Sequence, residues 1–388
     1  MELSKRPATY AMPSYSLTGD LLGFLRCGLQ YRYTRIGQLP SSRPVQMWFG
    51  QFIHGVLEES FRRFDLARRQ GRWELPPWPE PVLEEILTLI KDRLAAQNLF
   101  AWSEELERLG DRRATAAVNE LGPELFPIIR RAEVRLNGAR PLPKEQIPVD
   151  CRFREADRYE MVGIVDVISH VELSDPRLQG NRFVQAIQSA LPTALPEKFE
   201  VIVDYKGRRR PQCTRASDGP NYWDIYGWQL QTYGHLRSRH EDSLPVVAGA
   251  LLFLNELVPT RSDLKQLRRE AREGTTDVAP EPGSETERLL TKWREKDEPL
   301  LLPFEFRFAR TIRVTPIDEE SIVKALSEFD AVVARIETCR GRELQDAKVL
   351  STWEKNPTDE STCTACDART FCPSCKLETT PILPGIRS

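Results

Sequence analysis

The sequence is poor in several features that mark common classes of protein. Its longest apolar run, Val246 to Leu254, is far too short to span a bilayer and is typical of a buried strand. The first residues, MELSKRPATYAMPSYS, contain no apolar segment of the kind found in secretory signals. The chain also lacks the Gly-x-x-x-x-Gly-Lys-Ser/Thr motif that binds nucleotide phosphates, so it is not itself a helicase. We expect a cytoplasmic protein without a membrane partner.

An excess of charge of either sign is lacking too. The 388 residues include 55 Lys and Arg against 57 Asp and Glu, which gives a formal net charge of −2. A basic surface over the whole protein is therefore excluded, and any nucleic-acid site must be a local patch. Hydrophobic residues make up 40% and charged residues 29% of the chain, which predicts a globular protein with a sizeable core.

The period of the apolar residues changes along the chain and predicts how the chain is organised. Helical periodicity dominates to about residue 130, and apolar runs typical of strands follow. The expected segments are N-terminal helices (1–72), a helical insertion (73–130), an α/β core (131–255), a charged surface excursion (256–303) and a C-terminal helix with a cysteine-rich module (304–388). The predicted helices cover 17–35, 49–69, 82–97, 102–121, 123–131, 222–239 and 316–339, and the predicted strands cover 133–136, 148–154, 161–169, 199–205, 245–254 and 304–314. This order predicts an α/β fold with helical additions.

Two predicted strands carry carboxylates that are costly to bury without a cation or a base. They read Gly163-Ile-Val-Asp166-Val-Ile168 and Val201-Ile-Val-Asp204-Tyr-Lys206. Asp204 and Lys206 are two residues apart, so their side chains share one face of the strand. Two such carboxylates can hold Mg²⁺ or Mn²⁺, and an adjacent lysine can assist an attacking water. The same pattern also suits two strand-end aspartates that pair with Lys206 and nearby arginines.

Two helical segments carry further polar side chains. His54 lies in an amphipathic helix, where a lone histidine is more often structural than catalytic. Gln229 and Tyr233 are four residues apart on the helix that follows the Asp204 strand, so they share a helix face. Taken alone, this polar and aromatic face is more often involved in core packing than in a site.

Together these segments resemble the PD-(D/E)xK nuclease superfamily, in its RecB-like branch. Five blocks in the family's order carry the resemblance: Tyr15-Ser-Leu-Thr18 leading to Arg26-Cys27-Gly28, Gly50-x-x-x-His54, Gly163-x-x-Asp166, Asp204-x-Lys206, and Gln229-x-x-x-Tyr233. Family members often have Cys-Pro where this chain has Cys27-Gly28. The resemblance implies a restriction-endonuclease-like core with a mixed sheet flanked by helices. Residues 73–130 and 256–303 lie outside it.

The resemblance implies a role for each residue of these blocks. His54, Asp166 and Asp204 would ligate Mg²⁺ or Mn²⁺, with the carbonyl of Tyr205 as a further ligand. Lys206 would be the catalytic lysine. Gln229 and Tyr233 would position the lysine or the DNA backbone. Glu133 lies where the family often has a glutamate on an early core strand, and it is assigned no role.

Cysteines form a second signal, since Cys363-x2-Cys366-x5-Cys372 has the spacing of thiolates that bind zinc or an iron–sulfur cluster. The fourth ligand is either Cys375, which would make a local site that suits zinc, or the distant Cys27. In the RecB-like branch, AddB-type helicase-nucleases and the iron–sulfur nuclease of CRISPR adaptation hold a [4Fe–4S] cluster with an N-terminal cysteine and a C-terminal triad. The resemblance therefore implies such a cluster on Cys27, Cys363, Cys366 and Cys372.

A run of arginines, Arg208, Arg209 and Arg210, follows Lys206 after one glycine and predicts contacts with DNA phosphates, although charge runs are more often solvated surface. The aromatic residues Tyr222, Trp223, Tyr226 and Trp228 suit either base stacking or core packing.

The function that these signals favour is a Mg²⁺- or Mn²⁺-dependent deoxyribonuclease that acts on single-stranded DNA or DNA ends in repair, recombination or antiviral defence. Its expected partners are DNA and a helicase, an integrase or another repair or defence protein. The alternatives are a nuclease that trims spacer precursors for CRISPR adaptation and a non-catalytic DNA-binding subunit of a defence complex.

Overall fold

The computed structural model describes residues 12–39, 45–148, 156–192, 194–213, 221–346, 348–356, 360–369 and 372–374. The chain divides into two compact units, which are described separately. Unit 1 consists of residues 1–43, 137–163 and 323–388, and unit 2 consists of residues 44–136 and 164–322. Strands β2 (Ile129–Pro141) and β3 (Arg158–Ser169) each contribute residues to both units.

Unit 2 contains a mixed sheet with the strand order β3–β5–β6–β7. Strand β5 runs antiparallel to β3 and parallel to β6, and β6 runs antiparallel to β7. In addition to parts of β2 and β3, unit 2 contains the strands β4 (Val171–Glu172), β5 (Lys198–Lys206), β6 (Val246–Phe253) and β7 (Ile312–Pro316). Its helices include α3 (Val45–Arg69), α4 (Glu80–Ala95), α5 (Glu104–Ala116), α6 (Gly122–Leu125), α7 (Arg182–Ala190), α8 (Tyr222–Ser238), α9 (Arg261–Glu273), α10 (Glu285–Lys292) and α11 (Phe304–Thr311). These elements confirm the predicted α/β class with a mixed sheet, and they are consistent with a restriction-endonuclease-like core.

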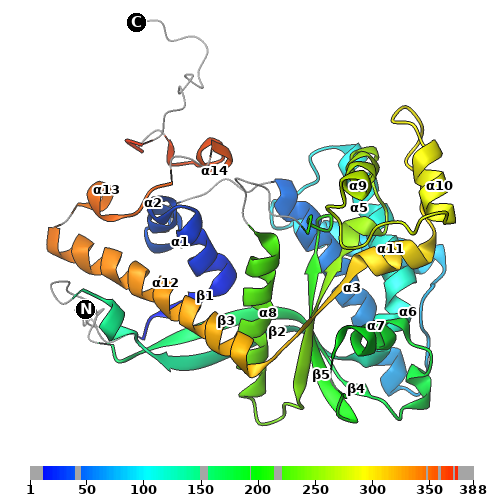
Figure 1. The fold of residues 1–388 in the computed structure, drawn as a ribbon, viewed down its shortest axis with the longest axis horizontal. Helices are drawn as coiled ribbons and strands as arrows, with labels where there is room; N and C mark the ends of the chain where they lie inside the picture. The colour runs from blue at the N-terminus through cyan, green and yellow to red at the C-terminus, as the bar shows by residue number, and fades with distance from the viewer. Residues whose placement is uncertain are drawn as a thin grey trace, which may run out of the picture. The chain divides into compact units, whose positions relative to one another are not determined.

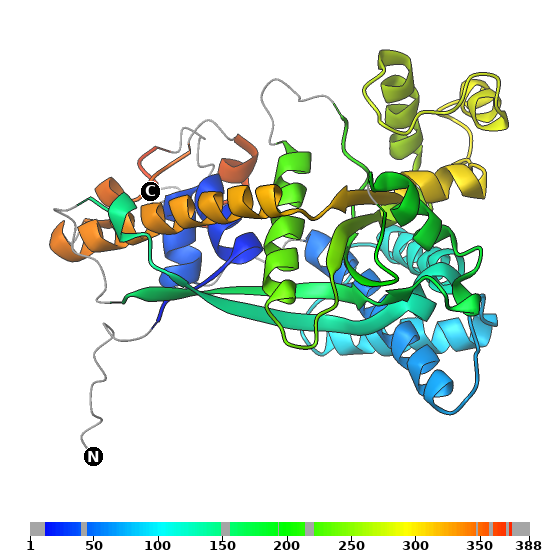
Figure 2. The same ribbon diagram turned by 60° about the horizontal axis from the view of Figure 1, so that its bottom comes forward.

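Alternation along β5 sends its side chains to two different environments. Val201, Val203 and Tyr205 join the large apolar core that also contains α3, α4 and α7. Glu200, on the opposite face, accepts hydrogen bonds from the buried guanidinium of Arg237 on α8. Figures 1 and 2 show α8 as the green helix that runs alongside these strands. Asp204 and Lys206 therefore lie on the α8 side of β5.

A glycine allows α8 to pack closely on the sheet. A Cβ at Gly249 of β6 would lie 2.7 Å from side-chain atoms of Leu230, so any larger residue would push the helix away. The ion pair between Glu200 and Arg237 and this close approach together fix how far α8 stands from β5, and with it the distance from Gln229 to Lys206.

Helix α3 forms because its apolar residues recur at the helical period, as the sequence predicted. Phe52, Ile53, Val56 and Leu57 are almost fully buried in the core of unit 2. A Cβ at Gly55 would lie 3.0 Å from Ile90, so α3 also packs tightly against α4.

The strand predicted over residues 304–314 is wrong, because residues 304–311 form helix α11 and β7 begins only at Ile312. The alternation Phe-Glu-Phe-Arg-Phe suggested a strand. In the helix Phe304 and Phe308 are one turn apart, with ring centroids 5.6 Å apart. Arg307 donates hydrogen bonds to the carbonyls of Leu302 and Leu257, so contacts distant in sequence override the local pattern.

Most other predicted elements match the structure with shifts at their ends, and the strand predicted over 133–136 is the middle of the longer β2. The helix predicted over 17–35 is interrupted at Cys27, whose backbone is extended. The helical stretch predicted over 123–131 ends early, because β2 begins at Ile129. The strand predicted over 148–154 lies, except for its first residue, outside the described residues.

Unit 1 contains the short strand β1 (Ser14–Ser16), which pairs in parallel with residues 160–162 of β3. Its helices include α1 (Leu22–Arg26), α2 (Gly28–Tyr31), most of α12 (Glu319–Asp346), α13 (Val349–Thr352) and α14 (Glu360–Thr364). Partly buried polar contacts join α12 to the rest of the unit: the hydroxyl of Tyr159 donates to Asp330 at 2.6 Å, and Arg32 forms a two-pronged ion pair with Glu343.

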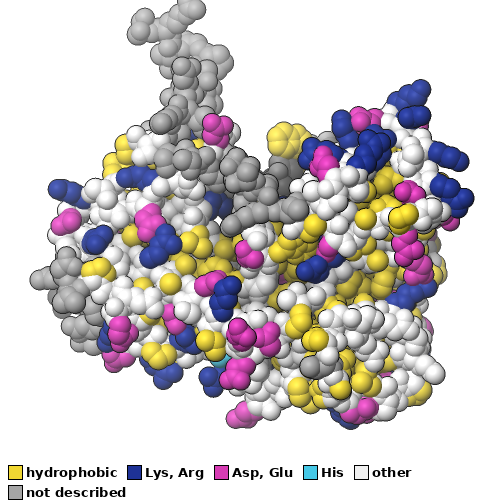
Figure 3. All heavy atoms as spheres, in the orientation of Figure 1, with side chains coloured by type: hydrophobic (Ala, Val, Ile, Leu, Met, Phe, Trp, Pro, Cys, Tyr) yellow, Lys and Arg dark blue, Asp and Glu magenta, His cyan; other side chains and the backbone are white. Residues whose placement is uncertain are grey.

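None of the helices in the described part of the chain is both long enough and apolar enough to cross a lipid bilayer. On the face seen in Figure 3, basic and acidic side chains are interspersed, as the near-neutral net charge predicts.

We predict that Asp277→Asn destabilises the protein by about 3 kcal/mol at pH 7, because it leaves the buried Arg210 without its countercharge. Arg210 is 3% exposed and donates to both carboxylate oxygens of Asp277, at 2.6 and 2.7 Å. Burial opposes the charge on Asp277, but Arg210 and Arg313 hold its pKa below the usual value. The stabilisation is therefore fully present above the unfolded-state pKa, about 3.9, and is lost as the pH falls through the lower folded-state pKa.

Urea unfolding of both proteins at pH 7 and near pH 3 measures this effect. The exposed pair Arg72–Glu74 provides the control, because Glu74→Gln should change stability by less than about 0.5 kcal/mol. Equal losses for Asp277→Asn and Glu74→Gln at pH 7 would contradict the assignment.

Candidate functional site

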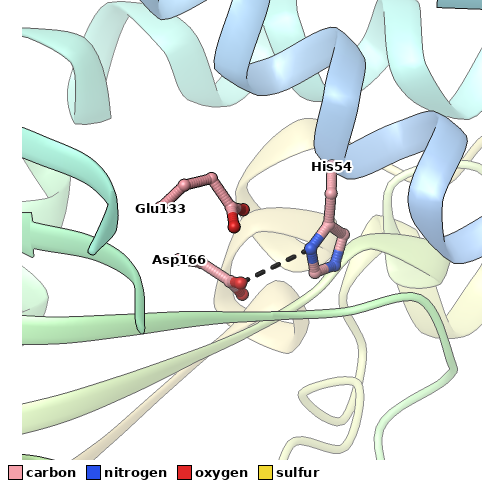
Figure 4. Close-up of side chains that lie close together, drawn as sticks. All are labelled: His54, Glu133 and Asp166. Carbon is pink, nitrogen blue, oxygen red and sulfur yellow. Dashed lines mark ion pairs between the residues drawn. The ribbon is translucent and has the colours of Figure 1, made fainter. Parts of the chain in front are cut away.

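Three side chains from different elements of unit 2 converge on one point (Figure 4). They are His54 of α3, Glu133 of β2 and Asp166 of β3, and their potential ligand atoms lie within 4.8 Å of one another. The Nδ1 atom of His54 lies 3.5 Å from Oδ1 of Asp166, and the two side chains are 28% and 12% exposed. An imidazole and two carboxylates form a donor set that suits a divalent ion.

Asp166 is held in place where strands β3 and β5 part. Their pairing includes Val167 with Val203. Two residues beyond Val203, the amide N–H of Tyr205 donates to the side-chain oxygen Oδ2 of Asp166, at 2.6 Å. The ring of Tyr205 packs edge-on against His54, with centroids 5.4 Å apart. The backbone and the ring of Tyr205 therefore position both of these groups, while its carbonyl remains a predicted ligand.

Asp204 lies on the α8 side of β5 and is 6% exposed. Its Oδ2 lies 2.5 Å from Nζ of Lys206, so this carboxylate oxygen is in direct contact with the ammonium group. Burial raises the pKa of Asp204 to about 6; the charge of Lys206 opposes this shift and that of Asp166 adds to it. Such an oxygen fits a site for a cation, although Asp204 is not one of the three clustered side chains.

The ammonium group of Lys206 is held by contacts from α8. It donates a hydrogen bond of 2.8 Å to Oε1 of Gln229, whose amide in turn donates to the hydroxyl of Tyr233 at 3.3 Å. It also lies 4.7 Å from the centre of the Tyr226 ring. The structure thus brings Lys206, Gln229 and Tyr233 together in the order that the sequence predicted, and adds Tyr226.

Glu133 is the site residue to which the sequence assigned no role. Its φ of 51° is a left-handed backbone conformation, which is unfavourable for a glutamate inside a strand. Burial and the charge of Asp166 raise its pKa to about 7. Strain of this kind commonly marks functional sites. Neither the strained backbone nor the neighbouring charges can be recognised in the local pattern Arg-Ala-Glu-Val-Arg.

The acidic surrounding of His54 raises the pKa of its imidazole. Burial opposes the charge, but the hydrogen bond and charge of Asp166, with the charges of Asp204 and Glu133, raise its pKa above the ordinary value. The cluster therefore attracts positive charge, whether that charge is a proton on His54 or a cation.

The three arginines after Lys206 do not form one surface. Arg209 pairs with Glu270 at 2.5 Å, and Arg210 is buried against Asp277. Both guanidinium groups thus anchor the 256–303 segment, which does not agree with the prediction that they contact DNA. Arg208 is exposed, and its guanidinium carbon lies 3.9 Å from the centre of the Tyr222 ring.

The cysteines of the predicted cluster lie in unit 1. Cys27 interrupts the helix between α1 and α2, and the next residues dock on the segment before the C-terminal triad. The amide of Leu29 donates to the carbonyl of Glu354 at 2.8 Å, and a Cβ at Gly28 would lie 3.1 Å from the same oxygen. This close approach explains why glycine follows Cys27.

The thiols of Cys27 and of the triad are all partly buried. Burial raises the pKa of Cys366, and the charges of Cys27 and Cys372 add to this shift. The Sγ atom of Cys363 lies 3.8 Å from the carbonyl of Asn356. Cys375, the alternative fourth ligand, lies outside the described residues.

Residues 19–178 match the family model of the PD-(D/E)XK nuclease superfamily. The matched range includes His54, Glu133 and Asp166 and ends before Asp204 and Lys206. The similarity indicates a nuclease, and nucleases of this superfamily usually use divalent metal ions. No curated protein matches the chain.

We predict that Glu133→Asn, assayed at pH 8 in the presence of a chelator, stabilises the protein by about 1 kcal/mol, since asparagine tolerates a left-handed backbone and removes a charge beside Asp166. Gln38, whose φ is 52°, provides the control: Gln38→Asn relieves the backbone alone. Denaturant unfolding should rank Glu133→Asn above Gln38→Asn, and both above the wild type. A less stable Glu133→Asn protein would show that Glu133 is not strained by its site.

Proposed function

We propose that the protein is a metal-dependent deoxyribonuclease of the RecB-like branch. The observation that supports this most is the convergence of His54, Glu133 and Asp166 beside the Asp204–Lys206 ion pair. The site would hold Mg²⁺ or Mn²⁺ with these acidic groups and the imidazole. The buried carboxylate of Asp204 is suited to the same ion. The reaction is hydrolysis of a phosphodiester bond by water.

The proposed chemistry divides between the ion and the lysine. A divalent ion lowers the pKa of a coordinated water and stabilises negative charge on the phosphate. Lys206 would orient the attacking water and neutralise charge that develops on the phosphate oxygens. Gln229 and Tyr226 limit the motion of its ammonium group, and Tyr233 limits that of Gln229. His54 and Glu133 would complete the ion's surroundings.

Asp204→Asn and Lys206→Met should each lower DNA cleavage by about 10²–10³-fold, because each keeps the side-chain shape and removes a charge that the reaction requires. The assay follows a labelled single strand and a labelled duplex with Mg²⁺, Mn²⁺ or a chelator. Asp157→Asn, at a carboxylate that is 89% exposed in unit 1, is the control and should cleave as the wild type does. Wild-type rates for either site variant would refute the assignment.

For unit 1 we propose a [4Fe–4S] cluster on Cys27, Cys363, Cys366 and Cys372, which would join the two ends of the chain. The contact between Leu29 and Glu354, which brings the residues after Cys27 against the segment that precedes the triad, supports Cys27 as the fourth ligand. Zinc on the same thiols is the alternative. A stabilising role suits this cluster, because the proposed catalytic residues belong to unit 2.

Cys27→Ser should bleach the brown colour of the anaerobically purified protein and lower its stability, because one cluster ligand is lost. Cys375→Ser should keep the colour, and so should Asp204→Asn, which is not a cluster ligand. Visible absorbance and analysis for iron, sulfide and zinc make the distinction. One zinc per chain without iron or sulfide would refute the cluster and leave the nuclease proposal intact.

The process that we propose is the trimming of DNA ends in repair, recombination or defence, with DNA as the partner of unit 2 and a helicase, integrase or similar protein as a further partner. A purely structural DNA-binding role is disfavoured because a scaffold has no need of the strained Glu133 or of the buried Asp204–Lys206 pair.

A further inference from the structure

A column of two stacked rings with a cation at each end extends from Lys206 toward the surface of unit 2. Lys206 lies 4.7 Å from the centre of the Tyr226 ring, and Tyr226 stacks on Tyr222 with centroids 6.1 Å apart and planes at 28°. The guanidinium carbon of Arg208 lies 3.9 Å from the centre of the Tyr222 ring. Lys206 is the last residue of β5 and Arg208 lies two residues beyond it, and the two tyrosines lie one turn apart at the start of α8.

The outer half of this column has no evident role in folding. Trp223 and Tyr226 pack on Phe253 and so belong to the core side of α8, whereas Tyr222 is only half-buried and Arg208 is exposed. In the part of the chain that the structure describes, no carboxylate forms an ion pair with Arg208. Its neighbours Arg209 and Arg210 both have such partners.

We propose that Arg208 and Tyr222 form a platform that stacks an unpaired base of the DNA strand being cut. This inference rests on the proposed nuclease function and specifies its substrate. A guanidinium plane lying on a ring presents a flat cationic surface, and aromatic and arginine surfaces bind unpaired bases with little sequence preference. The N–H groups of the same guanidinium suit a phosphate of that strand. A base inside a duplex is covered on both faces, so the platform selects a single strand or a frayed end.

The column also places the platform close to Lys206, the proposed catalytic lysine. Tyr226 contacts both Tyr222 and the ammonium of Lys206, so a base stacked on the platform belongs to a nucleotide close to the phosphate being cut. Loss of the platform should therefore affect binding at one or two positions along the strand rather than at all of them.

The experiment is an abasic scan with a labelled oligothymidine strand, in which one nucleotide at a time lacks its base. Binding is measured by fluorescence anisotropy in the presence of a chelator, and cleavage is measured separately with Mn²⁺. The wild type should bind about tenfold more weakly when the abasic site falls at the stacked position. We call this loss of affinity at one abasic position the dip. Tyr222→Ala should abolish the dip, so that affinity no longer depends on the abasic position. Tyr222→Phe, which keeps the ring, should retain the dip. Arg208→Lys should reduce the dip while leaving the salt dependence of binding nearly unchanged, because the charge remains.

Two controls show whether these effects are specific. Tyr222 is the first residue of α8 and its helix cap is Asn221, so Tyr222→Ala leaves the cap intact, and an unchanged melting curve verifies this. Trp102→Ala removes another aromatic side chain that is 77% exposed, and the dip should remain. A flat scan for the wild type, or a dip that persists in Tyr222→Ala, would overturn the platform even if the protein cuts DNA. Absence of metal-dependent cleavage by the wild type would instead overturn the proposed function.

Discussion

The arrangement of the site depends on one hydrogen bond, from the amide N–H of Tyr205 to the carboxylate of Asp166. It forms where β3 and β5 part. The side chain of Asp166 on β3 therefore accepts the hydrogen bond that a backbone carbonyl of β3 would accept in a continuous ladder. This fixes Asp166 opposite the strand that carries Asp204 and Lys206. The apolar face of α3 then brings His54 to Asp166, and α8 brings Gln229 to Lys206.

The site concentrates negative charge from three strands in one place. Lys206 offsets the charge of Asp204, and a protonated His54 would offset that of Asp166, but Glu133 adds a third carboxylate on a strained backbone. A fold that keeps such a group gains nothing in stability from it. The arrangement becomes favourable when a divalent ion joins the carboxylates, and this is the physical reason to regard the cluster as a metal centre.

Much of the core could be predicted from sequence, because its signals are local. Asp204 and Lys206 share a face through the period of a strand, and Gln229 and Tyr233 share one through the period of a helix. Glu133 gained no role because its backbone angle leaves no trace in the sequence. The prediction that Arg209 and Arg210 contact DNA failed for a related reason. Their partners, Glu270 and Asp277, lie some 60 residues further along the chain. Only the folded structure brings these charges together.

The account is tested most directly by locating the ion. Crystals soaked in Mn²⁺ and measured at a wavelength where manganese scatters anomalously would show its position without reference to activity. The account predicts an anomalous peak in contact with His54, Glu133 and Asp166, which disappears in the Asp166→Asn protein. Manganese bound elsewhere in unit 2, or an empty cluster in soaked crystals that diffract well, would contradict it.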